Sequence, residues 1–96
     1  MSKDVHNSAK EIYALIHDIL WNDWDPIGIK GIGTDDEYDG YIGQITSLLR
    51  DDWSEREIAI VLGRIVTEVM GLQANPQIDQ VVAKKLKAEY ESRFAK

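Results

Sequence analysis

The residues of this chain that could do chemistry are mostly carboxylates, and they cluster in the first half of the sequence. Between positions 17 and 41, seven acids are accompanied by a single base, Lys30. Carboxylates in this number could bind a divalent cation, perform acid–base catalysis or attract a basic partner. The seven acids are Asp18, Asp23, Asp25, Asp35, Asp36, Glu37 and Asp39.

Calcium binding is the first chemistry that this cluster suggests. Asp35, Glu37 and Asp39, followed by Gly40, resemble the start of an EF-hand loop. The twelfth position of such a loop would be Thr46, where the calcium ion requires a bidentate glutamate. We therefore expect no EF-hand and assign no metal ligands. Weak binding of divalent cations by the cluster stays open.

Other enzyme chemistry lacks its usual residues. The chain has no cysteine, which excludes a thiolate zinc site and a cysteine nucleophile. His6 and His17 are too far apart in sequence for a paired-histidine zinc motif. Glycines 28, 31 and 33 precede a predicted helix, but no strand comes before them, and the surrounding acids would repel phosphate. We expect no catalytic residues, no cofactor and no enzyme activity, although paired carboxylates could still act as acid and base.

The net charge limits the class of partner. Seventeen acids against eleven bases give a net charge of −6 at pH 7, whereas nucleic acids and anionic membranes attract a basic surface. We expect neither as a partner. Because no apolar run is long enough to span a bilayer and the chain starts without a secretory signal, we expect a cytoplasmic protein. Residues 1–52 carry −7 and residues 53–96 carry +1, so a charge-driven partner should contact the first half.

The elements that position these acids are predicted to be helices. Apolar residues recur at spacings of three and four nearly throughout the chain, and 96 residues allow one domain. We predict an all-α fold, an antiparallel bundle of about four helices over residues 1–96. An ordered loop with Gly and Pro, at 25–33, would join helices one and two; the order of the first seven residues is left open. The boundary signals are Asp25-Pro26, capping boxes at Thr34–Glu37 and Ser54–Glu57, Gly71, and Asn75-Pro76.

The fourth helix is predicted to bury one apolar stripe. Its members are Ile78, Val81, Val82, Leu86, Tyr90 and Phe94.

Two interpretations of the acids stay open. Asp35, Asp36 and Glu37 would lie in the first turn of the second helix, where the helix dipole favours anions. Asp18, Asp23 and Asp25 would lie at the C-terminal end of the first helix, where it disfavours them. Those three acids would either form internal salt bridges, for instance Asp25 with Arg64 or with a lysine of the fourth helix, or bind a partner.

Aromatic residues alternate with these acids. Such a composition is typical of a surface that captures a basic protein, because aromatic anchors supply burial and acids steer the encounter. Alternatively, Trp24 and Tyr38 are core residues with polar neighbours. The candidate partner-binding residues are Asp18, Asp23, Trp24, Asp25, Asp35, Asp36, Glu37 and Asp39.

Three short motifs resemble a group of short bacterial proteins. They are Trp24-Asp25-Pro26-Ile27-Gly28, Asp36-Glu37-Tyr38-Asp39 and Met70-Gly71-Leu72, and the resemblance covers roughly residues 10–90. The group's pattern is WDPIG, DEYD and MGL, from which Lys30–Gly33 departs as an inserted-looking segment. Its members look like small acidic helical domains, and some are suspected to be immunity proteins, the antitoxins of contact-dependent growth inhibition and other polymorphic toxin systems.

The resemblance and the acidity together favour one functional hypothesis. We expect a non-enzymatic immunity protein that binds and neutralises a cognate toxin. A basic nuclease is the favoured toxin class, because a nuclease is positive where it meets nucleic acid. The alternative is a homodimeric or adaptor interaction domain in which the Trp and Tyr residues form the interface.

Overall fold

The computed structural model describes the backbone of residues 2–26 and 38–94 and the side chains of residues 9–26 and 38–94. Within these ranges the chain has four helices and no strand, which confirms the predicted all-α class. The helices are α1 (Ser2–Ile19), α2 (Ile42–Arg50), α3 (Glu55–Arg64) and α4 (Pro76–Arg93). Short turns extend three of them: the π-helical η1 (Leu20–Trp24), the 3-10 turn η2 (Asp39–Tyr41) and the π-helical η3 (Ile65–Val69).

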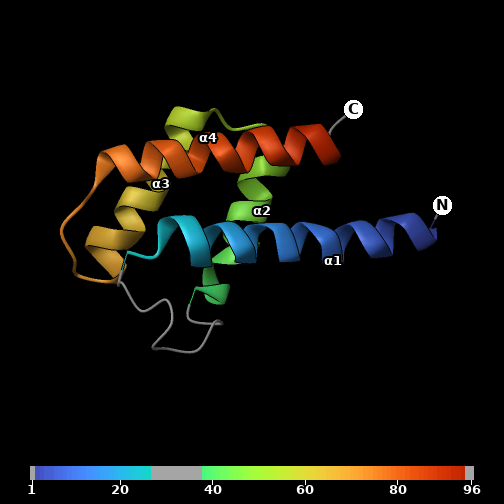
Figure 1. Cartoon of the computed structure of the whole chain (residues 1–96), viewed down its shortest axis with the longest axis horizontal. Helices are drawn as coiled ribbons and strands as arrows, with labels where there is room; N and C mark the ends of the chain where they lie inside the picture. Colours follow the sequence, from blue (N-terminus) through green and yellow to red (C-terminus); the bar gives the residue numbers. More distant parts are fainter. Residues whose placement is uncertain (1, 27–37, 95–96) are drawn as a thin grey trace.

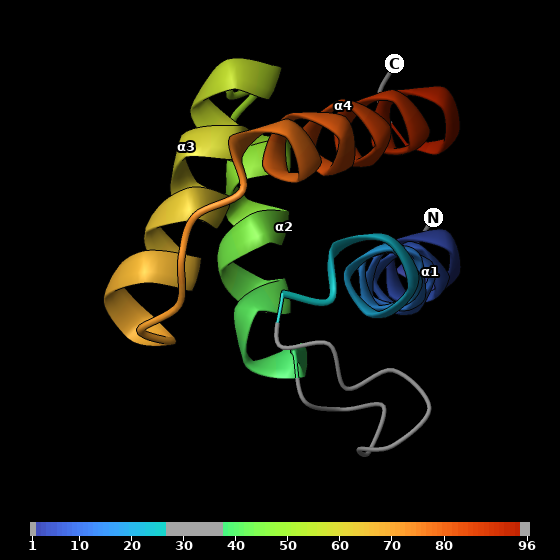
Figure 2. The same ribbon diagram turned by 60° about the vertical axis from the view of Figure 1, so that its left-hand side comes forward.

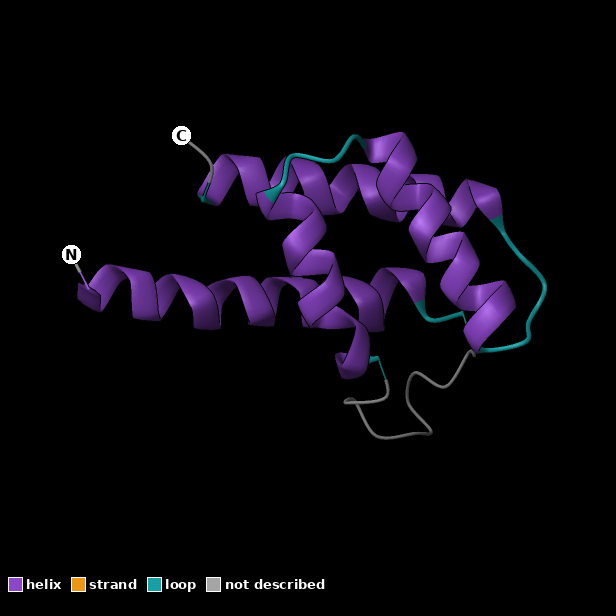
Figure 3. Cartoon of the chain, turned by 180° about the vertical axis from the view of Figure 1, so that it is seen from behind, coloured by secondary structure: helices purple, strands orange, loops and turns teal. Residues whose placement is uncertain are grey.

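α1 and α4 form an antiparallel pair, which α2 and α3 cross (Figures 1 and 2). α1 and α4 lie side by side and run in opposite directions, so the beginning of α1 and the end of α4 are at the same end of the molecule. α2 and α3 also run in opposite directions and cross the first pair, with α2 against α1 and α3 against α4. The view from behind shows the same helical arrangement (Figure 3).

The core is built mainly from isoleucine and leucine, and every helix contributes to it. Ile16 of α1, Ile45 of α2, Ile58 of α3 and Leu86 of α4 are all fully buried. Burying a side chain of this size stabilises the fold by about 1.5–3 kcal/mol. None of the helices in the described part of the chain is long and apolar enough to cross a membrane.

The predicted boundaries of the last two helices are confirmed. Ser54 and Glu57 form a full capping box, with two reciprocal hydrogen bonds of 3.1 Å. Gly71 follows the end of η3 with φ +69°, in the left-handed region where a side chain would be strained. Asn75 caps α4 by accepting a hydrogen bond from the backbone N–H of Ile78 at 3.3 Å.

The segment around Asp25 ends the first helix where the sequence predicted. Asp25 adopts a left-handed conformation, with φ 34°, and its N–H donates a hydrogen bond to the Leu20 carbonyl at 2.9 Å. On the far side of the loop, Tyr38 lies in a turn and helical structure begins at Asp39. The predicted capping box at Thr34–Glu37 and most of the predicted ordered loop, from Ile27 on, lie outside the described residues.

The buried stripe of α4 differs from the prediction. Ile78 and Val81 are 40% and 66% exposed, whereas Asp79 is only 3% exposed. The buried positions of α4 are Asp79, Val82, Ala83 and Leu86, which follow the helical spacing of three and four through a polar residue. The prediction was confirmed at Val82 and Leu86 and was wrong at Ile78 and Val81, because it selected positions by hydrophobicity, while a hydrogen bond between Asp79 and Trp24 keeps the Asp79 carboxylate inside.

Candidate partner-binding site

Four of the predicted acids lie in the described residues at one end of α1. Asp18 is in the last turns of α1, Asp23 is in η1, Asp25 follows η1, and Asp39 opens η2. We call these four residues the acidic region. Asp35, Asp36 and Glu37 lie outside the described residues.

Asp39 is fixed to α1 by a histidine. The Nδ1 atom of His17 lies 2.7 Å from Oδ1 of Asp39, and both side chains are partly buried. Because His17 directly precedes Asp18, this hydrogen bond brings η2 next to the turn of α1 that carries Asp18. Asp18 and Asp39, which are far apart in the sequence, therefore lie on neighbouring segments.

Asp25 is held by a tyrosine rather than by an arginine. The hydroxyl of Tyr38 donates a hydrogen bond of 2.6 Å to Oδ1 of Asp25. Tyr38 is buried, and its ring packs against Trp24 at a centroid distance of 5.6 Å. Arg64, the base proposed above for Asp25, lies 3.9 Å from the carboxylate of Glu68 on its own segment.

Asp23 forms an internal salt bridge, which is one of the two alternatives that the sequence left open for this residue. Lys85 of α4 donates a hydrogen bond of 2.9 Å to Oδ2 of Asp23. This hydrogen bond raises the pKa of Lys85 above its ordinary value of 10.5. Exposed ion pairs of this kind contribute little to stability, because solvent and salt screen them. Asp23 can therefore exchange Lys85 for a basic group of a partner at little energetic cost.

Trp24 is a core residue with polar neighbours, as the second of the two interpretations of the aromatic residues expected. Only 3% of its surface is exposed, and its ring meets Tyr41 edge-on at 6.1 Å. Its indole nitrogen donates a hydrogen bond of 3.0 Å to Oδ1 of Asp79. Trp24 thus holds the backbone between Asp23 and Asp25 against the core. Its ring is buried and cannot serve as an exposed anchor for a partner.

Sequence reasoning missed Asp79. This residue lies in the first turn of α4, and burial raises the pKa of its carboxyl while the Trp24 hydrogen bond lowers it. The available signal was its spacing from Val82, Ala83 and Leu86, which places it on the same face of the helix.

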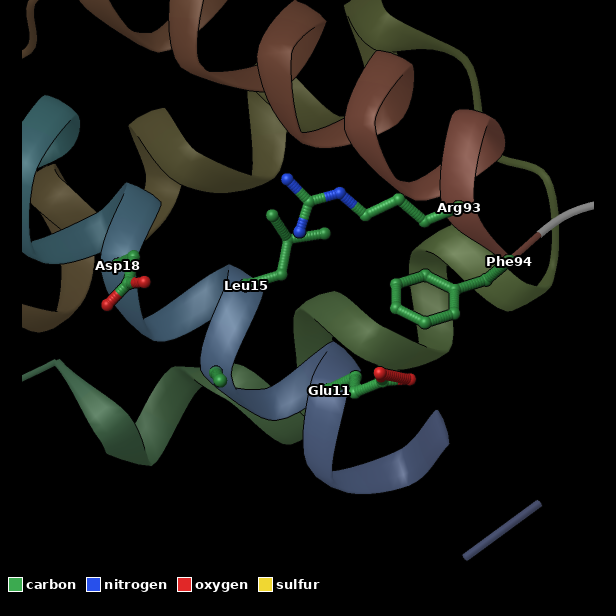
Figure 4. Close-up of a pocket in the computed structure, with 6 residues that line it drawn as sticks. Glu11, Leu15, Asp18, Arg93 and Phe94 are labelled. Atoms are coloured by element: carbon green, nitrogen blue, oxygen red, sulfur yellow. The ribbon is translucent and has the colours of Figure 1, made fainter. Parts of the chain in front are cut away.

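A cavity of about 610 Å³ lies beside the acidic region, between α1 and the end of α4. Figure 4 shows Glu11, Leu15 and Asp18 along α1, with Arg93 and Phe94 reaching toward them from the other side. The side chain of Arg93 forms an ion pair of 3.0 Å with Glu89. The cavity thus presents Glu11 and Asp18 on the α1 side.

No three His, Asp or Glu side chains in the described part of the chain are grouped closely enough to hold a metal ion. The acidic region combines fixed carboxylates with an ion pair that can exchange, which suits recognition of a basic surface.

Comparisons with known proteins return no relative. No protein-family model, no curated protein and no solved structure matches the chain. The resemblance to the WDPIG…DEYD…MGL group therefore stays a prediction.

Proposed function

We propose that this chain is a cytoplasmic, non-enzymatic immunity protein that binds and neutralises a cognate bacterial toxin through the acidic region. The observation that carries the proposal is the gathering of Asp18, Asp25 and Asp39, from three segments, at one end of α1. The motif resemblance described above supports the same function. The favoured toxin is a basic nuclease, since its positive substrate-binding face would attract this region.

The geometry of the acids supports binding without large rearrangement. Asp25 and Asp39 are each held by a hydrogen bond to a neighbouring ring side chain, Tyr38 and His17. Carboxylates that are already oriented lose little conformational entropy when a partner binds. Acidic groups also accelerate diffusional encounter with a positive surface, which an inhibitor of a lethal enzyme needs.

The test uses the gene next to the one for this chain. The C-terminal domain encoded immediately upstream is expressed in a bacterial host with and without this protein, and growth is followed. We expect growth to stop without this protein and to resume with it. A neighbour that is harmless, or toxic in both cultures, would contradict the proposal.

A second candidate function is a homodimeric or adaptor interaction domain. It is favoured by exposed apolar side chains of α3, η3 and α4, namely Ile60, Val69, Ile78 and Val81. Apolar contact persists at high salt, whereas charge-driven contact weakens. Size-exclusion chromatography at low and high salt therefore separates the candidates: a dimer that is stable at high salt favours this one.

A further inference from the structure

A second candidate site lies where α3 meets the start of α4. A groove of about 370 Å³ there is lined by Ile60, Gly63, Pro76 and Asp79, with Arg56 also contributing to its wall. A smaller cavity of about 190 Å³ reaches Asp79 from the side of Trp24 and Ile78. The carboxyl group of Asp79 thus lies where two cavities converge.

The two oxygens of this carboxyl group differ in their surroundings. Oδ1 accepts the hydrogen bond from Trp24 at 3.0 Å. Oδ2 accepts none from any described residue, although Asp79 is 3% exposed. Within the described part of the chain, no fully buried polar side-chain atom lacks a partner, so Oδ2 must still reach solvent, and the cavities are its route.

The position of Oδ2 favours a ligand that carries hydrogen-bond donors. A carboxylate oxygen with restricted access to solvent is poorly hydrated, and a charge-assisted hydrogen bond from a ligand would stabilise it. Burial raises the pKa of Asp79, and a cation next to Oδ2 would lower it again, because the cation favours the charged form.

We propose that the α3–α4 groove binds the cationic end of a lysine or arginine side chain from a partner protein, with Oδ2 of Asp79 as acceptor. The alkyl stem of such a side chain suits apolar walls such as Ile60 and Pro76. This site goes beyond the acidic region, since it uses other residues and other helices.

Gly63 keeps the acceptor accessible. A Cβ atom at this position would lie 3.2 Å from Oδ2 of Asp79, closer than an ordinary van der Waals contact. An alanine there would therefore crowd the oxygen that the cation must reach. Arg56 should weaken binding of the ligand, because it lines the same groove and its positive charge repels a second cation.

The test is a titration of the full chain with n-butylguanidinium, followed by the NMR signal of the Trp24 indole N–H. This proton points at the same carboxyl group, so binding at Oδ2 should shift its resonance in a saturable way. Asp79→Asn keeps an acceptor for the indole and removes the charge, and should weaken binding by about tenfold. Gly63→Ala should weaken it as well, whereas Arg56→Gln should strengthen it.

Controls separate binding in the groove from a general attraction of the cation to carboxylates. Asp51→Asn removes an exposed carboxylate outside both the groove and the acidic region and should leave the titration unchanged. Circular dichroism confirms that each variant is folded. A titration without saturation, or equal binding by Asp79→Asn, would overturn the proposal and leave solvent water as the partner of Oδ2. Because the experiment needs no toxin, its failure is distinguishable from failure of the immunity function.

Discussion

The indole nitrogen of Trp24 lies 3.0 Å from Oδ1 of Asp79 and joins the end of the first helix to the start of the last. Both residues are 3% exposed, so a polar group from each element is buried at one junction. This hydrogen bond holds η1 against α4, and Asp23 and Asp25 are the two sequence neighbours of Trp24. The acidic region and the α3–α4 groove therefore share one structural support.

Loss of the indole donor should destabilise the protein. Trp24→Phe retains an aromatic ring but leaves both oxygens of the buried Asp79 without a donor, so we expect a loss of about 1–3 kcal/mol in the free energy of unfolding. Trp21→Phe is the matched control, because Trp21 is only partly buried and packs 6.2 Å from the ring of Tyr38. Urea unfolding measures both variants, and equal losses would contradict the role given to this hydrogen bond.

Asp79 should make stability fall as the pH rises. Burial raises its pKa in the folded protein above the value of 3.8 expected in the unfolded chain. Below 3.8 both states are protonated, and as the pH rises through the interval up to the folded pKa, the unfolded state ionises first and is favoured. The stability of Asp79→Asn relative to the unsubstituted chain should therefore increase with pH across this interval. Unfolding free energies at several pH values test this, and a relative stability that stays constant or decreases would refute it.

Lys87 should hold the α2–α3 connection against α4. Its ammonium group donates hydrogen bonds of 2.8 Å to Asp52 and 2.9 Å to the Trp53 carbonyl, and the Asp52 bond is the main cause of its raised pKa. Lys87→Met keeps the alkyl stem and removes these donors, so we expect a loss of about 1 kcal/mol. Lys84→Met, at an exposed position of the same helix, should cost little; thermal unfolding compares them. Equal shifts in Tm would show that Lys87 does not have this role.

The capping box of α3 should stabilise the protein through hydrogen bonds between residues that are close in the sequence. Ser54→Ala removes the side chain that accepts the Glu57 N–H, which should cost about 1 kcal/mol. Ser47→Ala, on α2, removes only a hydroxyl bonded to the Gly43 carbonyl one turn back and should be nearly neutral. Urea unfolding gives both values, and a cost at Ser47 as large as that at Ser54 would argue against the capping role.

Sequence alone predicted the features that depend on neighbouring residues. The capping box at Ser54, the left-handed Gly71 and the Asn75-Pro76 helix start follow from local backbone chemistry, and the structure contains all three. The partners of the acids depend on residues far apart in the chain. Periodicity has no means of pairing Asp23 with Lys85 or of burying Asp79 against Trp24. For the same reason the sequence suggested Arg64 for Asp25 and placed Ile78 and Val81 in the core.

Toxin capture by the acidic region is tested by the association rate with the toxin domain encoded next to this chain. The measurement compares Asp18→Lys with Asp51→Lys, because both positions are exposed and the charge change is the same. Asp51 lies outside the acidic region. It follows the last turn of α2, whereas Asp39 of the acidic region lies just before the first turn of that helix.

We predict that Asp18→Lys slows association several-fold at low salt, that the difference shrinks at high salt, and that Asp51→Lys associates nearly as fast as the unsubstituted chain. An unchanged rate for Asp18→Lys, or an equal slowing by Asp51→Lys, would contradict the assignment of toxin capture to the acidic region.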